Sequence, residues 1–388
     1  MASATASAPV TTAAGRPPGY YVRQRLWQNR PAVAGLAFIA LCALVALLGY
    51  WVLPDNSPNA NHGFVQLQKQ PPGLRVRFIR RTPSDSVPVT GNLFTTWLRG
   101  REAPEEMIIA GGADLKTSVD SFAIAPWVEP GTQPQAPVRL ALKDWQGSLQ
   151  SSSQGARWAS RTYWLGTDKA GRDELSRLLL GTRISLGIGL VAVLISLVLG
   201  MAVGAVAGYF GGWVDSLLLG VMTVVWSIPG IMLVIAISLA LDSKGVWVSF
   251  VAVGLTMWVD VARVVRGQML SLRAATFVEA GWVLGLPTSR LIARHLLPNM
   301  RGPLIVLATS NFASAILLEA GLSFLGLGVQ PPAPSWGLMV KEGYDLLGTQ
   351  AGLWLTLLPG AAISLLVLSF NLLGNGLRDA YDPKTPVQ

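Results

Sequence analysis

Apolar residues cluster into long runs along this chain, separated by short polar segments and by one long polar stretch. The first run, 32–53, is uncharged and long enough to cross a bilayer as a helix. Five more runs follow, at about 184–210, 216–241, 246–262, 303–327 and 351–374. About half of the residues are hydrophobic and few are charged, which is typical of membrane proteins. The pattern predicts an all-α polytopic membrane protein with six transmembrane helices.

Glycines and prolines predict how these helices pack and bend. Gly200, Gly204 and Gly208 recur every four residues in the second run and form a ridge that allows close contact with another helix. Pro229 and Pro359 lie inside later runs, where they predict kinks.

The polar stretch 54–163 is too long to be structureless beside a compact helix bundle. Within it, 73–81 and 138–143 alternate apolar and basic residues, which predicts half-exposed strands between Pro- and Gly-rich turns. We therefore expect a small β-rich extracytoplasmic insertion. For its basic cluster, 75–81, a solvated strand face is favoured over a docking site for a partner.

Basic residues that flank the runs predict the orientation of the chain. The segment 1–31 begins rich in Ala, Ser, Thr and Pro, which predicts disorder, and ends with arginines. The run after it is too long for a cleaved signal peptide and lacks a small-x-small site. Three arginines within 263–273 indicate that the following segment, 276–299, is cytoplasmic. Counting helices then puts both termini, including the tail 375–388, in the cytoplasm.

Charge and motif content argue against several functions. The formal net charge is +9, but the basic residues lack interleaved aromatic residues, so membrane topology explains them better than nucleic-acid binding does. One cysteine, Cys42, and two distant histidines offer neither an internal disulfide nor a metal site. The sequence has no G-x-x-x-x-G-K-[ST] phosphate loop and no plausible Ser-His-Asp set. We expect no catalytic residues, cofactor or metal, so any ATP hydrolysis needs a separate subunit.

Two carboxylates lie within the later runs. Glu319 must face a partner or water, because an ionisable group in lipid is costly. Hydrogen bonding to a neighbouring helix or to the loop after it is the favoured interpretation, and contact with a translocation path is the alternative. Asp260 precedes Arg263 and Arg266, which predicts an interfacial ion pair. A secondary transporter or channel using Glu319 and Asp260 is the alternative function, although no repeated pair of broken helices supports it.

The segment 276–299 predicts a helix–loop–helix elbow on the membrane surface. Its first helical turn is expected to be exposed and to include Val278, Ala280, Trp282 and Val283. Gly285 can end this helix in the left-handed conformation, which glycine adopts without strain. A second short helix, 289–297, then leads to Pro298, which can start the next helix because it has no amide hydrogen to lose.

The elbow resembles the EAA loop of ABC-importer permeases. The resemblance rests on Glu279, Ala280, Gly281, Gly285, His295, Leu297 and Pro298. Gly281 replaces the second alanine of that loop, and His295 stands in the isoleucine position. The resemblance implies that these residues, with Trp282 as a buried anchor, couple the chain to an ATPase subunit.

A second signal lies in 164–183, WLGTDKAGRDELSRLLLGTR. It predicts an amphipathic helix at the outer interface, capped by Thr167 or Asp168, with Arg172, Arg177 and Arg183 at lipid head groups. The sequence is similar to the segment that precedes the core domain, here 184–374, in dipeptide and oligopeptide permeases.

Together these resemblances imply the type I ABC importer permease fold and a permease subunit in a bacterial inner membrane. The implied partners are a second permease subunit in a heterodimer, two ATP-binding subunits or domains, and an extracytoplasmic solute-binding protein. The implied mechanism is alternating access for peptides or peptide-like solutes, with Glu319 and Pro229 as candidates for the translocation path. Relatives in this family also carry glutathione, nickel complexes and peptide antibiotics, so the sequence does not identify the solute.

Overall fold

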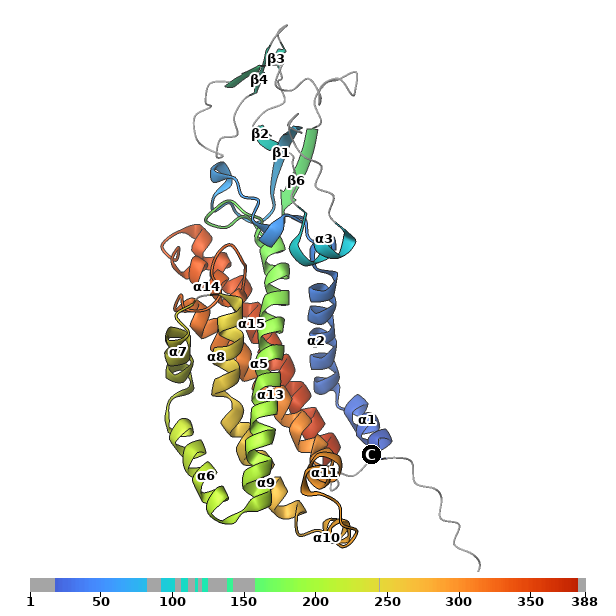
Figure 1. The fold of residues 1–388 in the computed structure, drawn as a ribbon. Coiled ribbons are helices and arrows are strands. Elements are labelled where there is room, and N and C mark those ends of the chain that lie inside the picture. Colours follow the sequence, from blue (N-terminus) through green and yellow to red (C-terminus); the bar gives the residue numbers. More distant parts are fainter. Residues whose placement is uncertain are drawn as a thin grey trace, which may run out of the picture.

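A computed structural model describes residues 18–81, 92–101, 106–110, 116–117, 121–124, 138–141, 158–243 and 245–382. Long helices form a bundle, and the β-strands gather beyond one end of it (Figure 1). The expected all-α polytopic architecture with a small β-rich insertion is confirmed. The disorder expected near the N-terminus falls largely on residues 1–17, which lie outside the described residues, as does 383–388, the last part of the predicted tail 375–388.

Among the described residues, five helical segments are long and apolar enough to cross a membrane, and a bent pair makes a sixth candidate. The five are Arg30–Trp51, which contains α2 (Arg30–Leu48), α5 (Glu174–Phe210), Val246–Leu272, α13 (Arg301–Phe324) and α15 (Gln350–Tyr381). Val246–Leu272 consists of α8 (Val246–Thr256) and α9 (Trp258–Leu272). These segments correspond to the six apolar runs of the sequence.

The bent pair is α6 (Gly212–Ser227) and α7 (Gly230–Ala240), which meet at 94°. The predicted kink at Pro229 is therefore a break in the helix. Ile228 is extended, with φ −84° and ψ 127°, because the proline ring disfavours the α conformation in the residue before it. Pro359, in contrast, lies inside the continuous helix α15.

The glycine ridge of α5 packs closely against another helix, as predicted, and that helix is α9. A Cβ built on Gly200 would lie 2.4 Å from Val261 Cβ, and one on Gly204 would lie 2.4 Å from the Ala262 carbonyl oxygen. At Gly208 the nearest atom would be Met269 Cβ, at 2.6 Å. All three distances are shorter than real Cβ contacts, so the close approach of these helices depends on glycine.

The separate interfacial helix predicted for 164–183 is wrong. Residues 164–173 form an irregular loop, in which Gly166 and Gly171 take positive φ angles of 78° and 73°. Helix α5 then begins at Glu174, where the Asp173 side chain accepts a hydrogen bond from the Ser176 amide at 3.1 Å. Asp173 is thus the N-cap, not Thr167 or Asp168.

The described parts of the insertion form two three-stranded antiparallel sheets. One has the order β2 (Glu106–Ala110), β1 (Leu74–Arg81), β6 (Trp158–Tyr163), and the other joins β3 (Lys116–Thr117), β4 (Ser121–Ile124) and β5 (Val138–Ala141). Both predicted strands are confirmed. In β1 the alternation holds, because Val76 and Phe78 are buried while Arg75 and Arg77 are exposed. The Arg75 and Arg77 side chains therefore lie on the solvated face of the strand.

Shorter helices complete the bundle. Helix α1 (Pro18–Gln28) lies near the C-terminal end of α15, and α14 (Trp336–Tyr344) lies at the same end as the strands (Figure 1). In the insertion, α3 (Leu93–Arg99) sits beside the end of α2, which continues as the short helix η1 (Gly49–Trp51).

Candidate functional site

The predicted elbow forms at the end of the bundle opposite the strands (Figure 1). Its first helix, α10, spans Thr276–Val283, and Gly285 follows with φ 71°, as predicted. The second part is helical from α11 (Thr288–Leu291) through a π-helical stretch (Ile292–Leu296) to α12 (Leu297–Asn299). Pro298 therefore lies in the last turn of this helix, and the next helix, α13, begins at Arg301.

One side of the elbow packs onto the bundle. Val278 is fully buried, which corrects its expected exposure, and it belongs to a core that includes Met269, Leu291 and Leu296. Gly281 is buried as well, and a Cβ there would lie 2.7 Å from Leu291 Cδ1. The glycine at this position of the elbow thus lets α10 lie against α11.

The other side of the elbow is open. Trp282, Val283 and Leu284 are 51%, 87% and 79% exposed, and Glu279 and Ala280 are exposed beside them. His295 is half-buried, and its carbonyl oxygen accepts a hydrogen bond from the Asn299 side chain at 2.7 Å. The elbow therefore has an exposed apolar surface. Its opposite side, called the base below, packs against the bundle.

Polar contacts connect this base to the last turn of α5. The Trp282 indole Nε1–H donates to the Tyr209 hydroxyl oxygen at 3.1 Å. The Arg273 guanidinium donates to the carbonyl oxygens of Tyr209, at 3.2 Å, and Gly208, at 3.4 Å. These carbonyls belong to a helix end, where the backbone has no partner within the helix.

The predicted ion pair of Asp260 with Arg263 and Arg266 is wrong. Arg266 instead bonds Asp215 at the start of α6, with Nε–Oδ1 and NH2–Oδ2 distances of 2.5 and 2.6 Å. Arg263 stacks over the Trp226 ring, 4.5 Å from its centroid. The Asp260 side chain is exposed. The bidentate Arg266–Asp215 pair ties α9 to α6.

Glu319 is almost fully buried, as its position in an apolar run requires. Its Oε1 atom accepts a hydrogen bond from the Ser323 hydroxyl at 2.7 Å, and the Ser323 oxygen accepts one from the Val329 amide at 3.1 Å. A Cβ on Gly337 of α14 would lie 2.6 Å from Ala320 Cα, so α14 packs tightly beside this turn. These contacts agree with the structural interpretation of Glu319, and a role in the path stays a prediction.

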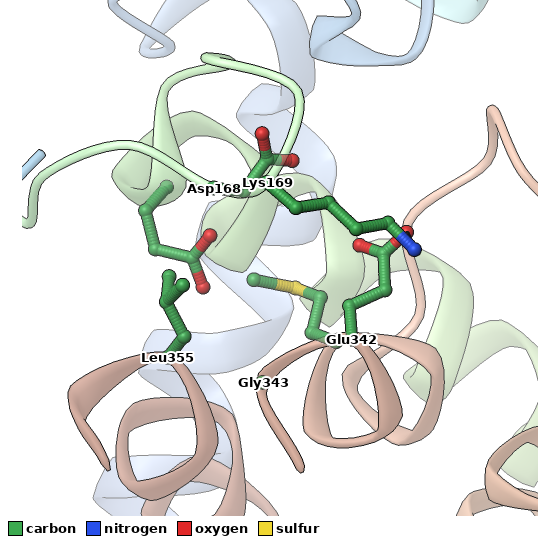
Figure 2. Close-up of a pocket in the computed structure, with 7 residues that line it drawn as sticks. Asp168, Lys169, Glu342, Gly343 and Leu355 are labelled. Atoms are coloured by element: carbon green, nitrogen blue, oxygen red, sulfur yellow. Dashed lines mark ion pairs between the residues drawn. The ribbon is translucent and has the colours of Figure 1, made fainter. Parts of the chain in front are cut away.

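A cluster of charges, most of them buried, occupies the end of the bundle that carries the strands, called the outer end below, between the loop 164–173 and α14. Figure 2 shows part of it around a small cavity of about 10 Å³, room for roughly one water molecule. Arg172 Nε lies 2.6 Å from Asp168 Oδ2, and Arg172 NH2 lies 3.4 Å from Glu342 Oε2. The exposed side chain of Lys169 also approaches the cluster, with Nζ 3.3 Å from Glu342 Oε1.

Arg177 completes this cluster from the second turn of α5. Its side chain is fully buried, with Nε 3.4 Å from Asp168 Oδ2 and NH2 3.6 Å from Glu342 Oε2. Arg172 and Arg177 therefore do not anchor to lipid head groups as predicted. The other predicted anchor, Arg183, stacks over Trp97 at 4.3 Å. Sequence reasoning missed Glu342, because its partners lie far away in the sequence.

Beside the cluster, Asp173 is buried and 3.6 Å from Arg161. Burial raises the pKa of the Asp173 carboxyl, and its hydrogen bonds to Ser176 together with the Arg161 charge oppose that shift. The outer cluster thus joins the insertion, α5 and α14 through charges held out of water.

Comparison with known proteins identifies the family. Residues 197–386 match the family described as binding-protein-dependent transport system inner membrane component. Residues 18–72 match the N-terminal TM domain of oligopeptide transport permease C.

Two relatives and one solved structure illustrate the similarity. The oligopeptide transport system permease protein OppC of Bacillus subtilis (strain 168) is 39% identical over 225 residues, 58% of this chain and 73% of the relative. The glutathione transport system permease protein GsiD of Pectobacterium atrosepticum is 40% identical over 58% of this chain and 74% of its own length. A structure of the MetNI methionine ABC transporter in an inward facing conformation aligns with a TM-score of 0.44 and 18% identity, over 54% of this chain and 98% of that chain.

The expected type I importer permease fold is in accord with the family match over the core helices. The family consists of membrane permease components of ABC transporters, and such components are not themselves enzymes. The chain therefore belongs to the family of binding-protein-dependent transport system inner membrane components.

Proposed function

We propose that this chain is the permease subunit of an ATP-driven importer and forms half of a translocation path for peptides or peptide-like solutes. The names of its relatives support the solute class, because they include oligopeptide, dipeptide and glutathione transport permeases. The path would open alternately to either side of the membrane as separate ATPase subunits bind and hydrolyse ATP.

The single observation that carries the proposal is the apolar surface of the elbow on its fixed base. Trp282, Val283 and Leu284 are more than half exposed, whereas Val278 beneath them is fully buried. A buried aromatic anchor surrounded by apolar contacts is typical of the centre of a protein interface. We propose that an ATPase subunit covers this surface, with Glu279, Ala280 and Gly285 at its edge.

The contacts of the elbow base would transmit motion of an ATPase into the membrane. Trp282 and Arg273 bond the end of α5, and the core around Met269 and Leu291 joins the elbow to α9. Packed helices move as rigid bodies rather than deforming continuously. Displacement of α10 would therefore displace α5 and α9 together.

The proposed assembly contains a second permease subunit, two ATP-binding subunits or domains, and an extracytoplasmic solute-binding protein. In this assembly the elbow and both termini face the cytoplasm and the insertion 54–163 lies outside. The opposite positions of elbow and strands support this orientation (Figure 1). We further propose that Glu319 and the break at Pro229 border the translocation path.

The test uses Val283→Asp, because Val283 is 87% exposed and contributes little packing that the change could disturb. Val65→Asp is the matched control, since Val65 is 75% exposed on the insertion. Both variants are produced with the ATPase subunits, and we measure their co-purification and ATP-dependent uptake of a labelled peptide into vesicles. Val283→Asp should lose both readouts and Val65→Asp should keep both. Wild-type association and uptake in Val283→Asp would overturn the proposed coupling surface.

Two further substitutions probe the shape of the elbow. Gly285→Asp places a side chain at φ 71°, a strained conformation for any residue with a Cβ. Glu279→Lys reverses an exposed charge. Both should abolish uptake while membrane insertion is unchanged.

A further inference from the structure

Helix α3 of the insertion has an apolar side that nothing in the described structure covers. Leu93, Phe94 and Leu98 are 77%, 65% and 46% exposed. At the spacing of a helix they share one side with Trp97, whereas Thr95 and Arg99 lie on the other. Arg99 and Arg101 follow at the C-terminal end and are exposed.

Contacts of Trp97 fix α3 to the outer end of α2. The Trp97 indole Nε1–H donates to the Leu47 carbonyl oxygen at 2.5 Å, and α3 packs against η1. From α5, the Arg183 guanidinium stacks over the Trp97 ring and donates to the Trp97 carbonyl oxygen at 2.9 Å. The helix is therefore held at the level of Leu47 on α2 and Arg183 on α5.

The position of Arg183 shows where that level lies in the bilayer. No charged residue occurs from there to Phe210, the last residue of α5. That length of helix spans about 40 Å at 1.5 Å per residue, close to the roughly 40–45 Å thickness of a bilayer with its head groups. Arg183 and α3 then lie at the outer head-group region.

The lipid-facing surface of α2 continues onto α3. Leu44, Leu47 and Trp51 are each more than half exposed along the outer half of α2 and η1, and in a membrane-spanning helix such residues face acyl chains. Tryptophan is enriched where head groups meet acyl chains. Arg99 and Arg101 carry the charge that suits lipid phosphates at the same level.

We propose that α3 is an interfacial membrane helix, with Leu93, Phe94 and Leu98 inserted at the boundary between head groups and acyl chains of the outer leaflet. The helix thereby fastens the insertion to the lipid surface beside α2. This proposal needs α2 and α5 to cross the membrane with the insertion outside, and it is independent of the coupling role of the elbow and of the solute.

Spin labels attached to single cysteines test whether the apolar side of α3 lies in the membrane interface. The full chain has one cysteine, Cys42, which is buried, so Cys42→Ala provides a background without native thiols. Phe94→Cys and Leu98→Cys place labels on the apolar side, and Thr95→Cys is the matched control on the polar side. Each labelled protein is reconstituted in phospholipid nanodiscs, and collision rates with oxygen and with a water-soluble nickel chelate are measured. Leu93→Cys replaces any variant that is not monodisperse.

Labels at 94 and 98 should collide mainly with oxygen, and the label at 95 mainly with the nickel chelate. Equal nickel accessibility at 94, 95 and 98 would overturn the proposal. Shielding of 94 and 98 that appears only after addition of the purified solute-binding protein would also overturn it, because the surface would then bind protein and not lipid.

Discussion

The Trp282 indole donates a hydrogen bond to the Tyr209 hydroxyl at 3.1 Å and so joins the exposed surface of the elbow to the last turn of α5. Trp282 is thus about half exposed, on the surface that the proposed ATPase partner would cover, and it also contacts the bundle. Force on this side chain reaches a membrane-spanning helix through one hydrogen bond and the packing around it.

Tyr209→Phe removes this acceptor and keeps the ring. A net hydrogen bond is worth about 0.5–1.5 kcal/mol, so the proposed ATPase subunits should still bind while less of their motion reaches α5. We expect fewer solute molecules imported per ATP hydrolysed, measured in proteoliposomes. Tyr344→Phe, at an exposed tyrosine of α14, should leave this ratio unchanged. If Tyr209→Phe imports as many solute molecules per ATP as the wild type, the hydrogen bond is not needed for coupling.

Gly204→Ala tests the contact between α5 and α9. The added Cβ would lie 2.4 Å from the Ala262 carbonyl oxygen, and overpacking of this kind costs about 1–3 kcal/mol. The variant should melt at a lower temperature in detergent. Gly220→Ala in α6 is the control, because its Cβ meets nothing within 4 Å. That change should leave the melting temperature unchanged or raise it, since alanine favours helix.

Glu342→Gln tests the outer charge cluster. Removing this carboxylate leaves Arg172 and Arg177 buried with one fewer counter-charge, and breaking a buried pair costs about 3–5 kcal/mol. Thermal unfolding of the full chain should shift downward by several degrees. Asp345→Asn, at an exposed carboxylate three residues away, should melt like the wild type. Equal melting of the two variants would show that the cluster does not stabilise the fold.

Ser323→Ala and Glu319→Gln test separately whether the buried turn in α13 stabilises the fold and whether it takes part in transport. Ser323→Ala removes the hydroxyl that bonds both Glu319 and the Val329 amide, so it should destabilise the chain by about 1–3 kcal/mol. Glu319→Gln keeps an oxygen that can accept from Ser323 and should preserve the melting temperature. Lost uptake in a stably folded Glu319→Gln would support its position on the path, and normal uptake would restrict it to a structural role.

The sequence was most informative where one chemical property repeats along an element. The length of the uncharged runs located the membrane segments. The four-residue spacing of Gly200, Gly204 and Gly208 predicted a close contact with another helix, which the structure shows to be α9. Alternation in β1 correctly separated buried Val76 from exposed Arg77. In each case the pattern that supports the prediction lies within one continuous stretch of the sequence.

A pattern within one stretch of the sequence could not predict contacts between segments that are far apart in the sequence. Arg266 follows Asp260 closely, yet it bonds Asp215, because the start of α6 returns beside α9. Val278 belongs to a helix too short for its periodicity to show which side is buried. Glu342 was overlooked because only folding brings α14 to the loop that contains Asp168.

Helix α5 is a single unbroken element of 37 residues, about 55 Å long, that carries Tyr209 near one end and follows the Asp173 cap at the other. A rod of this kind has no joint at which its two ends could move separately. If separate ATPase subunits move the elbow as proposed, the strands at the other end of α5 would therefore move with it. A fluorophore on the insertion would then report each transport cycle from the side of the membrane opposite the elbow.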